Sequence, residues 1–266
     1  RTFLRKTSLN GCFLPQIPAK SETIRRMKTN LSRIIILAGG LMFTHLLSSA
    51  QSAGGVFVLG GIHQSHEKAQ KYTYERMGEI YQQLKPDILC VETKQKYVDD
   101  ASFKETPFDF KKFMIPLALH DSIPIYGIDW WDIEKGNKWQ QLQQKAMNDT
   151  SLIPEIRLSG GMFSLLNDYF KTRDFAEINS PGITRLWKAK NEFKYHIYAQ
   201  HPEYNFIVAF ENERNDHIVR NILEIISANP GKKILVAIGI DHKYYIEKEL
   251  ENQNIKVFQT DNLDQF

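Results

Sequence analysis

The feature that most constrains this chain is an apolar run, Val56 to Leu59, which ends in two glycines, Gly60 and Gly61, and is soon followed by His63. A short continuous apolar run of this kind is typical of a buried strand. Because glycine has no side chain, the pair predicts a sharp turn and leaves room for a close neighbour. In open α/β sheets, ligands bind beyond the carboxyl ends of the strands, so we expect His63 at such a position.

A second apolar run lies near the other end of the chain, at residues 233–238, and it is also followed by glycine and histidine, Gly239 and His242. Its Gly-x-x-His spacing is the same as that from Gly60 to His63. Two strands that end in this way can place both imidazoles at one edge of one sheet. The pairing predicts a functional site there; the alternative is two structural histidines.

Two further apolar runs end at acidic residues, Glu92 and Asp129. Helical spacing of apolar residues precedes each run, which predicts parallel βαβ units with right-handed crossovers. Both carboxylates then belong to the edge that carries the histidines. The alternative roles are an ion pair or cap for Glu92 and a simple turn former for Asp129. The expected elements are helix 67–85, strand 88–91, loop 97–106, helix 108–120 and strand 123–128.

The stretch from about 130 to 204 has a different character and predicts a helical insertion. Helices are expected at 135–148, 162–170 and 187–200, with breaks at Gly160-Gly161 and at Ser180-Pro181-Gly182. This region either caps the sheet edge or supplies ordinary layer helices, and the pattern leaves both readings open. His66 and Glu67, just beyond His63, are weaker site candidates.

The longest helical signal covers residues 203–228, and Arg214 lies on its apolar stripe between Phe210 and Ile218. A guanidinium on an apolar face is unfavourable unless an anion meets it. Arg214 therefore either clamps a substrate carboxylate or oxyanion, or forms an internal salt bridge to Glu92 or Asp129. The expected remaining elements are strand 233–238, helix 243–252 and strand 255–259.

The first 50 residues predict an export leader preceded by sequence that does not belong to it. Residues 27–50 have a basic start, an apolar centre and a small-residue end, as in a cleaved signal peptide; a retained anchor is the alternative. Residues 1–26 are then upstream sequence, with Met27 as the start. The chain after residue 50 carries 26 basic and 30 acidic residues, a net charge of −4, which argues against nucleic-acid binding. Cys90, the one cysteine left, is expected to be a buried apolar residue.

The candidate site side chains suit hydrolytic chemistry of two kinds. Imidazoles and carboxylates from His63, Glu92, Asp129 and His242 could hold a divalent transition metal that activates water. Without metal, one histidine could act as general base while Arg214 stabilises negative charge. The sequence has no glycine-rich phosphate loop, no Gly-x-Ser-x-Gly elbow and no HExxH helix.

These segments, together with Pro86-Asp87 and Glu213-Arg214-Asn215, resemble the TraB/Tiki (GumN-like) family within the erythromycin esterase and ChaN-like superfamily. The resemblance covers about residues 56–250, apart from the stretch 130–200. It implies a three-layer α/β/α fold around a mainly parallel sheet, and a site that joins His63, Glu92, Arg214 and His242. Members include metal-dependent proteases, esterases that open macrolide lactones with a histidine base, and haem-binding lipoproteins. The lipid anchor of the haem binders is not evident here.

We therefore expect an exported protein, periplasmic or secreted, with one α/β domain at residues 51–266 and a helical insertion. The predicted activity is hydrolysis of a peptide or ester bond in a peptide or small-molecule substrate, with a divalent metal as possible cofactor. Catalysis is assigned to His63, Glu92, Arg214 and His242, with Asp129 added as a metal ligand. No stable membrane insertion is expected after leader cleavage. The alternatives are a haem- or cofactor-binding protein without turnover and a scaffold that has lost its activity.

Overall fold

The computed structural model describes residues 54–266. The predicted upstream sequence at 1–26 and the leader at 27–50 lie outside these residues and stay predictions. The described residues fall within one compact unit, Gln51–Phe266.

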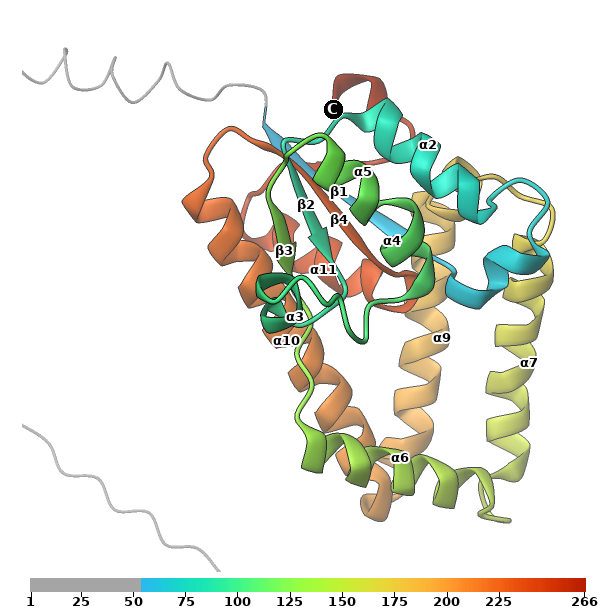
Figure 1. Ribbon diagram of the computed structural model, residues 1–266. Helices are drawn as coiled ribbons and strands as arrows, with labels where there is room; N and C mark the ends of the chain where they lie inside the picture. Colours follow the sequence, from blue (N-terminus) through green and yellow to red (C-terminus); the bar gives the residue numbers. More distant parts are fainter. Residues whose placement is uncertain (1–53) are drawn as a thin grey trace, which may run out of the picture. The chain divides into compact units, whose positions relative to one another are not determined.

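Five parallel strands form a single sheet in the order β3-β2-β4-β1-β5. This confirms the predicted α/β class with a parallel sheet, and helices surround the sheet (Figure 1). The long strands β1 and β4 are neighbours, although the 171 residues 62–232 separate them in the chain.

 The segment that joins the end of β1 to the start of β4 is thus long, and most of the domain's helices lie within it. The strands are β1 Gly55–Gly61, β2 Ile88–Val91, β3 Ile125–Gly127, β4 Lys233–Gly239 and β5 Val257–Phe258.

The helices follow the predicted order with some changes at their ends. They are η1 His63–Lys68, α2 Tyr74–Leu84, α3 Gln95–Asp99, α4 Phe108–Phe113, α5 Ile115–His120, α6 Ile133–Met147, α7 Ile153–Phe170, α8 Phe175–Ile178, α9 Pro181–Ala199, η2 Pro202–Tyr204, α10 Asn205–Ala228, α11 Ile240–Asn252 and η3 Leu263–Gln265. Among residues 54–266, no helix combines the length and apolar character that a membrane crossing requires.

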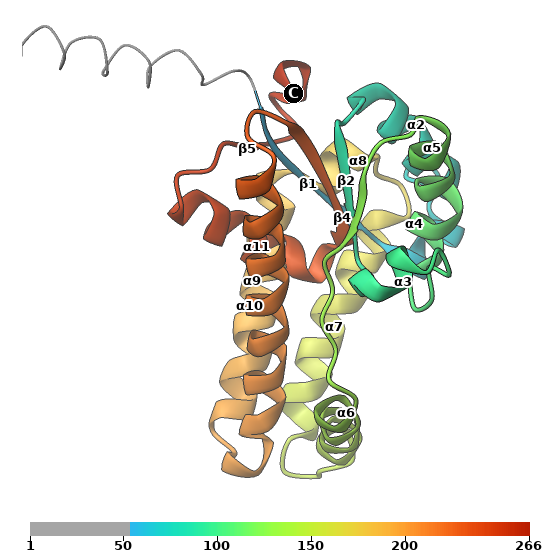
Figure 2. The same cartoon turned by 60° about the vertical axis from the view of Figure 1, so that its left-hand side comes forward.

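Alternating side chains of each strand enter two separate hydrophobic cores, one on each face of the sheet. Phe57, Leu89 and Leu235 pack on one face, which α2, α4 and α5 cover (Figure 2). Val58, Cys90 and Val236 pack on the other face, against Ile218 and Ile222 of α10 and Ile246 of α11. Cys90 is a buried free cysteine, as predicted. The layers are those of an α/β/α fold.

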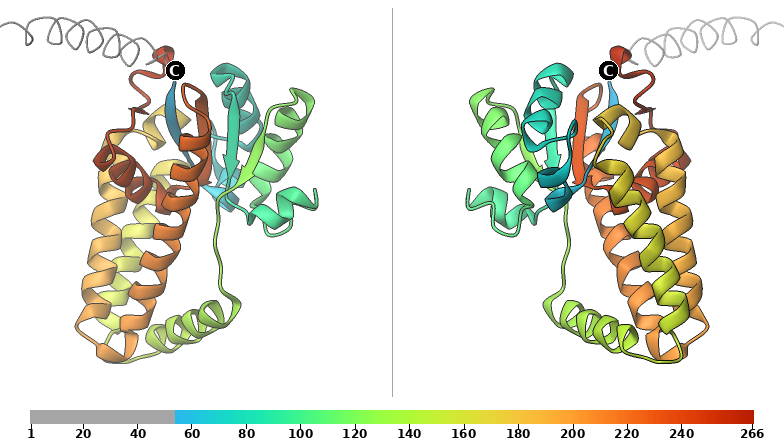
Figure 3. Two further views of the ribbon diagram at one scale, coloured as in Figure 1. Left: turned by 90° about the vertical axis from the view of Figure 1, so that its left-hand side faces the viewer. Right: turned by 90° about the vertical axis from the view of Figure 1, so that its right-hand side faces the viewer.

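Helices α7, α9 and the first half of α10 run alongside one another and extend past the carboxyl edge of the sheet, with α6 across their far ends (Figures 1 and 3). Of these helices, α6, α7 and α9 fall in the stretch of about 130–204 that is predicted as a helical insertion, whereas α10 follows it. A third, smaller hydrophobic cluster lies among these helices and includes Leu152, Ile197, Tyr204 and Ile207.

Several predicted boundaries in the helical regions are wrong. Gly160 and Gly161 do not break the chain; both lie inside α7, where an added Cβ would meet nothing. The predicted turn at Ser180 is instead the start of α9: the Ser180 hydroxyl accepts a hydrogen bond from the backbone N–H of Ile183, and Pro181 occupies the first helical position.

Other differences have equally local causes. The strand predicted to stop at Gly60 continues through Gly61, because both glycines still pair with β4. The predicted helix 108–120 is two helices, since Pro116 removes a backbone donor at the start of α5. The helix expected from residue 67 begins at Tyr74, after Thr73 caps it, and α3 occupies part of the predicted loop 97–106.

Candidate functional site

Four predicted site residues follow four neighbouring strands at one edge of the sheet. Asp129 follows β3, Glu92 follows β2, His242 follows β4 and His63 follows β1. The register pairs Gly61 with Gly239, so His63 is two residues beyond this pair and His242 three. The backbone then forms different structures: His63 opens η1, whereas His242 lies in the first turn of α11.

The Glu92 carboxylate lies between the two imidazoles. Its Oε2 is 3.6 Å from His63 Nε2, and its Oε1 is 3.9 Å from His242 Nε2. Oε2 also accepts a hydrogen bond of 2.7 Å from the backbone N–H of Gly239. Burial favours the neutral acid, but the positive charge of Arg214, together with the two histidines, lowers the pKa of Glu92 below its ordinary value.

Gly239 is required by this close approach. A Cβ at this position would lie 2.6 Å from His63 Nε2 and 3.2 Å from Glu92 Oε2. Glycine therefore allows the backbone of β4 to approach the imidazole and the carboxylate directly.

Arg214, on α10, forms ion pairs with both Asp129 and Glu92. It donates from Nε to Asp129 Oδ1 over 2.8 Å and from Nη2 to Glu92 Oε1 over 3.0 Å. Trp131 lies against the guanidinium, 5.4 Å from ring centre to Cζ. Burial opposes the charge, but the two carboxylates outweigh it and raise the pKa of Arg214. These contacts match the alternative that assigned Arg214 to an internal salt bridge.

His63 contacts Asp109 through Nδ1, and no sequence pattern singled out Asp109 as a site residue. Nδ1 is 3.2 Å from Asp109 Oδ2, and the Asp109 side chain is fully buried at the start of α4. Burial disfavours the imidazolium, but the hydrogen bond to Asp109 and the charge of Glu92 outweigh it and raise the pKa of His63 to about 9. Burial favours the neutral form of Asp109, but its interactions with His63 and His66 outweigh burial and hold the pKa of Asp109 well below its ordinary value.

His66 is a second histidine that lies beside Asp109. Its Nδ1 lies 2.6 Å from the carbonyl oxygen of Tyr72, and its Nε2 accepts from the backbone N–H of Ile62 and lies 3.5 Å from Asp109 Oδ2. His66 is thus buried beside Asp109 rather than facing Glu92, and Glu67 is exposed.

His242 contacts the amide of Asn215 through Nδ1 and the guanidinium of Arg214 through Nε2. Nδ1 is 2.6 Å from the amide oxygen of Asn215, so the proton belongs on Nδ1 and the lone pair on Nε2. Nε2 faces Arg214 Nη1 at 3.3 Å. Burial, followed by the charge of Arg214, lowers the pKa of His242, while the Glu92 carboxylate opposes this shift.

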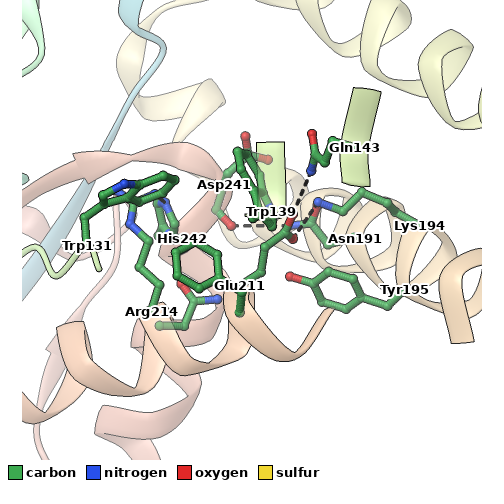
Figure 4. A pocket seen from close by; sticks show the side chains of 12 residues that line it. Trp131, Trp139, Gln143, Asn191, Lys194, Tyr195, Glu211, Arg214, Asp241 and His242 are labelled. Atoms are coloured by element: carbon green, nitrogen blue, oxygen red, sulfur yellow. Dashed lines mark hydrogen bonds and ion pairs between the residues drawn. The ribbon is translucent and has the colours of Figure 1, made fainter. Parts of the chain in front are cut away.

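Two cavities open beside these residues. The larger, about 500 Å³, is lined by His63, Glu92, Arg214, Gly239 and His242 and by side chains of η1, α7 and α9. The smaller, about 290 Å³, lies among α6, α9, α10 and α11 (Figure 4). Arg214, Asp241 and His242 line both cavities.

The predicted metal ligands do not gather around a position suited to a cation. Within residues 54–266, no three His, Cys, Asp or Glu side chains are arranged to hold a metal ion. Glu92, Asp129 and His242 contact the guanidinium of Arg214 instead. Because that positive charge lies among the donors, this arrangement does not fit a divalent ion.

No family model and no curated protein matches this chain. An erythromycin esterase mutant, solved in its open conformation, is similar with a TM-score of 0.29 and 12% sequence identity, over 74% of this chain and 63% of the esterase. The chain thus spans less than two thirds of that protein. The similarity is a weak one to a member of the predicted superfamily and supports no argument about the site; the TraB/Tiki resemblance stays a prediction.

Proposed function

We propose that this protein hydrolyses an ester or amide bond, with His242 as general base and His63 as general acid. The observation that carries the proposal is that two imidazoles lie on either side of Glu92 and line a cavity. The Nδ1 atoms of the two rings have different partners: a carboxylate for His63 and an amide oxygen for His242. Titratable groups whose surroundings move their pKa values apart are suited to paired acid and base roles.

His242 suits the role of base because its Nε2 carries a lone pair at neutral pH; this lone pair faces Arg214 Nη1 at 3.3 Å, a contact that the attacking water has to replace. Asn215 fixes the proton on Nδ1, and burial beside Arg214 disfavours the doubly protonated ring. In the proposed reaction, a water attacks the carbonyl carbon and gives its proton to His242 Nε2.

His63 suits the role of acid because Asp109 and Glu92 stabilise its protonated form. With a pKa of about 9, the ring carries a proton on both nitrogens at neutral pH. When the bond between the carbonyl carbon and the leaving oxygen or nitrogen breaks, His63 Nε2 donates its proton to the leaving atom. The proton held by His242 then returns to His63 through solvent, which restores the starting state.

Glu92 and Arg214 have supporting roles in this proposal. Glu92 lies between the rings and stabilises the imidazolium at either side. Arg214 balances the charges of Glu92 and Asp129 and holds both carboxylates in place. This assignment keeps His63 and His242 as the acid and the base, and it gives Glu92 and Arg214 supporting roles instead of the predicted ones.

A panel of p-nitrophenyl esters and p-nitroanilide amides tests the proposal. We expect turnover that falls at least about 100-fold in His63→Gln and in His242→Gln, the range that general acid or base catalysis contributes. His120→Gln is the matched control, because that side chain is 85% exposed. Activity that survives in both site variants, or no turnover of any ester or amide, would contradict the proposal.

Metal dependence is an expectation from the sequence that the position of Arg214 among the donors does not fit; export and membership of the TraB/Tiki family are separate proposals that also rest on the sequence. Elemental analysis of the purified chain against a His63→Ala, His242→Ala double variant tests the first; equal, near-zero metal in both would remove it. Sequencing the amino terminus of the exported chain tests the second, with a start directly after Ala50 as the expected result. The mechanism proposed above requires none of the three.

A further inference from the structure

The two cavities beside the site have a common wall made of Arg214, Asp241 and His242. Asp241 is the exposed part of this wall, with 51% of its side chain accessible. Lys190 of α9 donates to Asp241 Oδ1 over 3.0 Å, and Asn191 donates to the Asp241 carbonyl oxygen over 3.3 Å. Hydrogen bonds therefore connect the wall to α9, and the proposed base lies where the two cavities adjoin.

Each cavity is lined by aromatic side chains that the other cavity does not share. Phe163, Phe170 and Trp187 line the larger one, with Trp187 5.9 Å from Phe163 and 6.1 Å from Phe170 between ring centres.

In the smaller cavity the aromatic side chains are Trp131, Trp139, Tyr195 and Phe210. The Trp131 ring is edge-on to the rings of Trp139 and Phe210, at 5.7 Å and 5.0 Å between ring centres. Figure 4 shows Trp131 beside Arg214 and His242, with the polar group of Glu211, Gln143 and Lys194 at the other side of the cavity. Thus polar, reactive groups lie between two aromatic-lined spaces.

We propose that the substrate is a molecule with an aromatic ring on each side of the bond that is broken. One ring occupies the larger cavity, the other occupies the smaller cavity, and the ester or amide group lies over the wall of Arg214, Asp241 and His242. This inference rests on the proposed hydrolytic function and adds the substrate class. The cleaved bond is the one between the carbonyl carbon and the leaving oxygen or nitrogen; water supplies the hydroxyl group and the proton.

The charges around the wall favour a substrate without a negative charge. The guanidinium of Arg214 already faces two carboxylates, and Lys190 faces Asp241. A substrate carboxylate would meet the exposed Asp241 with no unpaired cation to balance it in this part of the wall. Neutral esters and amides are therefore the appropriate probes.

Three esters test the proposal in steady-state assays: benzyl phenylacetate with two rings, and methyl phenylacetate and benzyl acetate with one ring each. We expect kcat/KM for the two-ring ester to exceed that for either one-ring ester at least about tenfold, as expected for filling a further apolar subsite. Trp139→Leu should remove the preference for a ring at one end, and Phe163→Ala should remove it at the other end.

Leu158→Ala is the control for these variants, because Leu158 is 59% exposed on α7 and lines neither cavity. It should leave all three ratios unchanged. A two-ring ester that is no better than the one-ring esters would overturn the proposal. So would two variants that affect the same end of the substrate.

Binding of benzyl 2-phenylethyl ether, measured by calorimetry, separates this proposal from the hydrolytic one. The ether keeps both rings but has no bond that hydrolysis can break. If no ester is cleaved but the ether binds, and each variant weakens binding about tenfold, the two subsites stand and the hydrolytic function fails. If the ether does not bind, or if both variants bind it as the unmodified chain does, the two-subsite proposal is wrong.

Discussion

His63 and His242 lie on either side of Glu92, yet the two surroundings favour opposite protonation states. The outer nitrogen of His63 meets the buried carboxylate of Asp109, which favours a proton on both ring nitrogens. The outer nitrogen of His242 meets the amide of Asn215, and the guanidinium of Arg214 lies beside the inner nitrogen. Both rings share the carboxylate of Glu92, so Glu92 alone does not determine which ring is charged. The other partners do: Asp109 for His63, and Asn215 and Arg214 for His242.

Removing Arg214 should have the largest effect on this difference. Arg214→Met leaves Glu92 and Asp129 without their common cation, and loss of one partner from a largely buried ion pair destabilises a protein by about 3–5 kcal/mol. The pKa of His242 should also rise, because the positive charge beside it is gone. Urea unfolding and NMR titration of the imidazoles measure both effects.

The control for that variant is Arg220→Met, which removes an exposed arginine from the same helix. It should change the free energy of unfolding by less than about 0.5 kcal/mol. Equal losses in the two variants would show that the ion pairs of Arg214 do not hold the site together.

A side chain at residue 239 tests the close approach on the His63 side. Gly239→Ala places a Cβ 2.6 Å from His63 Nε2 and should destabilise the fold by about 1–3 kcal/mol, as overpacking does. It should also displace His63 more than His242. Gly160→Ala is the opposite case: no atom lies within 4 Å of the new Cβ, and replacement of a helical glycine should stabilise the chain by about 0.5–1 kcal/mol. Thermal unfolding of both variants should move in opposite directions.

Much of this arrangement could be predicted from short stretches of sequence. The apolar runs located β1, β2, β3 and β4, and parallel strands bring the residues after them to one edge, so the meeting of His63, Glu92, Asp129 and His242 follows from local patterns. Asp109 could not be found in this way, because it lies 46 residues beyond His63 within a helix, where an acidic residue in the first turn is common.

The glycine pair in α7 shows the opposite limit. Glycine lowers helix stability but does not forbid a helix, and Gly160 and Gly161 lie on an exposed part of an otherwise continuous one. The role of Arg214 was open for a different reason. Its place on an apolar stripe required an anion nearby, but the pattern could not decide whether that anion was a substrate or Glu92 and Asp129, which only the fold brings within reach.

Removing the carboxylate behind His63 should make the two histidines more alike. Asp109→Asn takes away the hydrogen bond and charge that raise the pKa of His63, so this pKa should fall from about 9 toward 6.5. If His63 is the general acid, the alkaline limb of the pH profile should move to lower pH by as much as the pKa of His63 falls. The pH dependence of kcat/KM, with Asp99→Asn on the exposed end of α3 as control, measures this.

Asp109→Asn should also change how the free energy of unfolding depends on pH. Because folding raises the pKa of His63, its protonation stabilises the folded chain fully below pH 6.5, and this contribution is lost as the pH rises through about 9. In Asp109→Asn the free energy of unfolding should therefore depend less on pH within this interval. An unchanged pH dependence would mean that Asp109 does not control the charge of His63.

The reciprocal exchange, Asn215→Asp, should have the smallest effect and gives the sharpest test of the comparison. It places a carboxylate where His242 now meets an amide oxygen, so the pKa of His242 should rise from its present position below 6.5. The effect is limited because Arg214 remains beside Nε2. If His242 is the base, activity at mildly acidic pH should decline while activity near pH 8 changes little.

The control is Asn205→Asp, which adds the same charge at an exposed position of α10 and should shift neither the acidic nor the alkaline limb of the pH profile. A shift of the alkaline limb instead would reverse the two assignments, with His242 as the acid and His63 as the base.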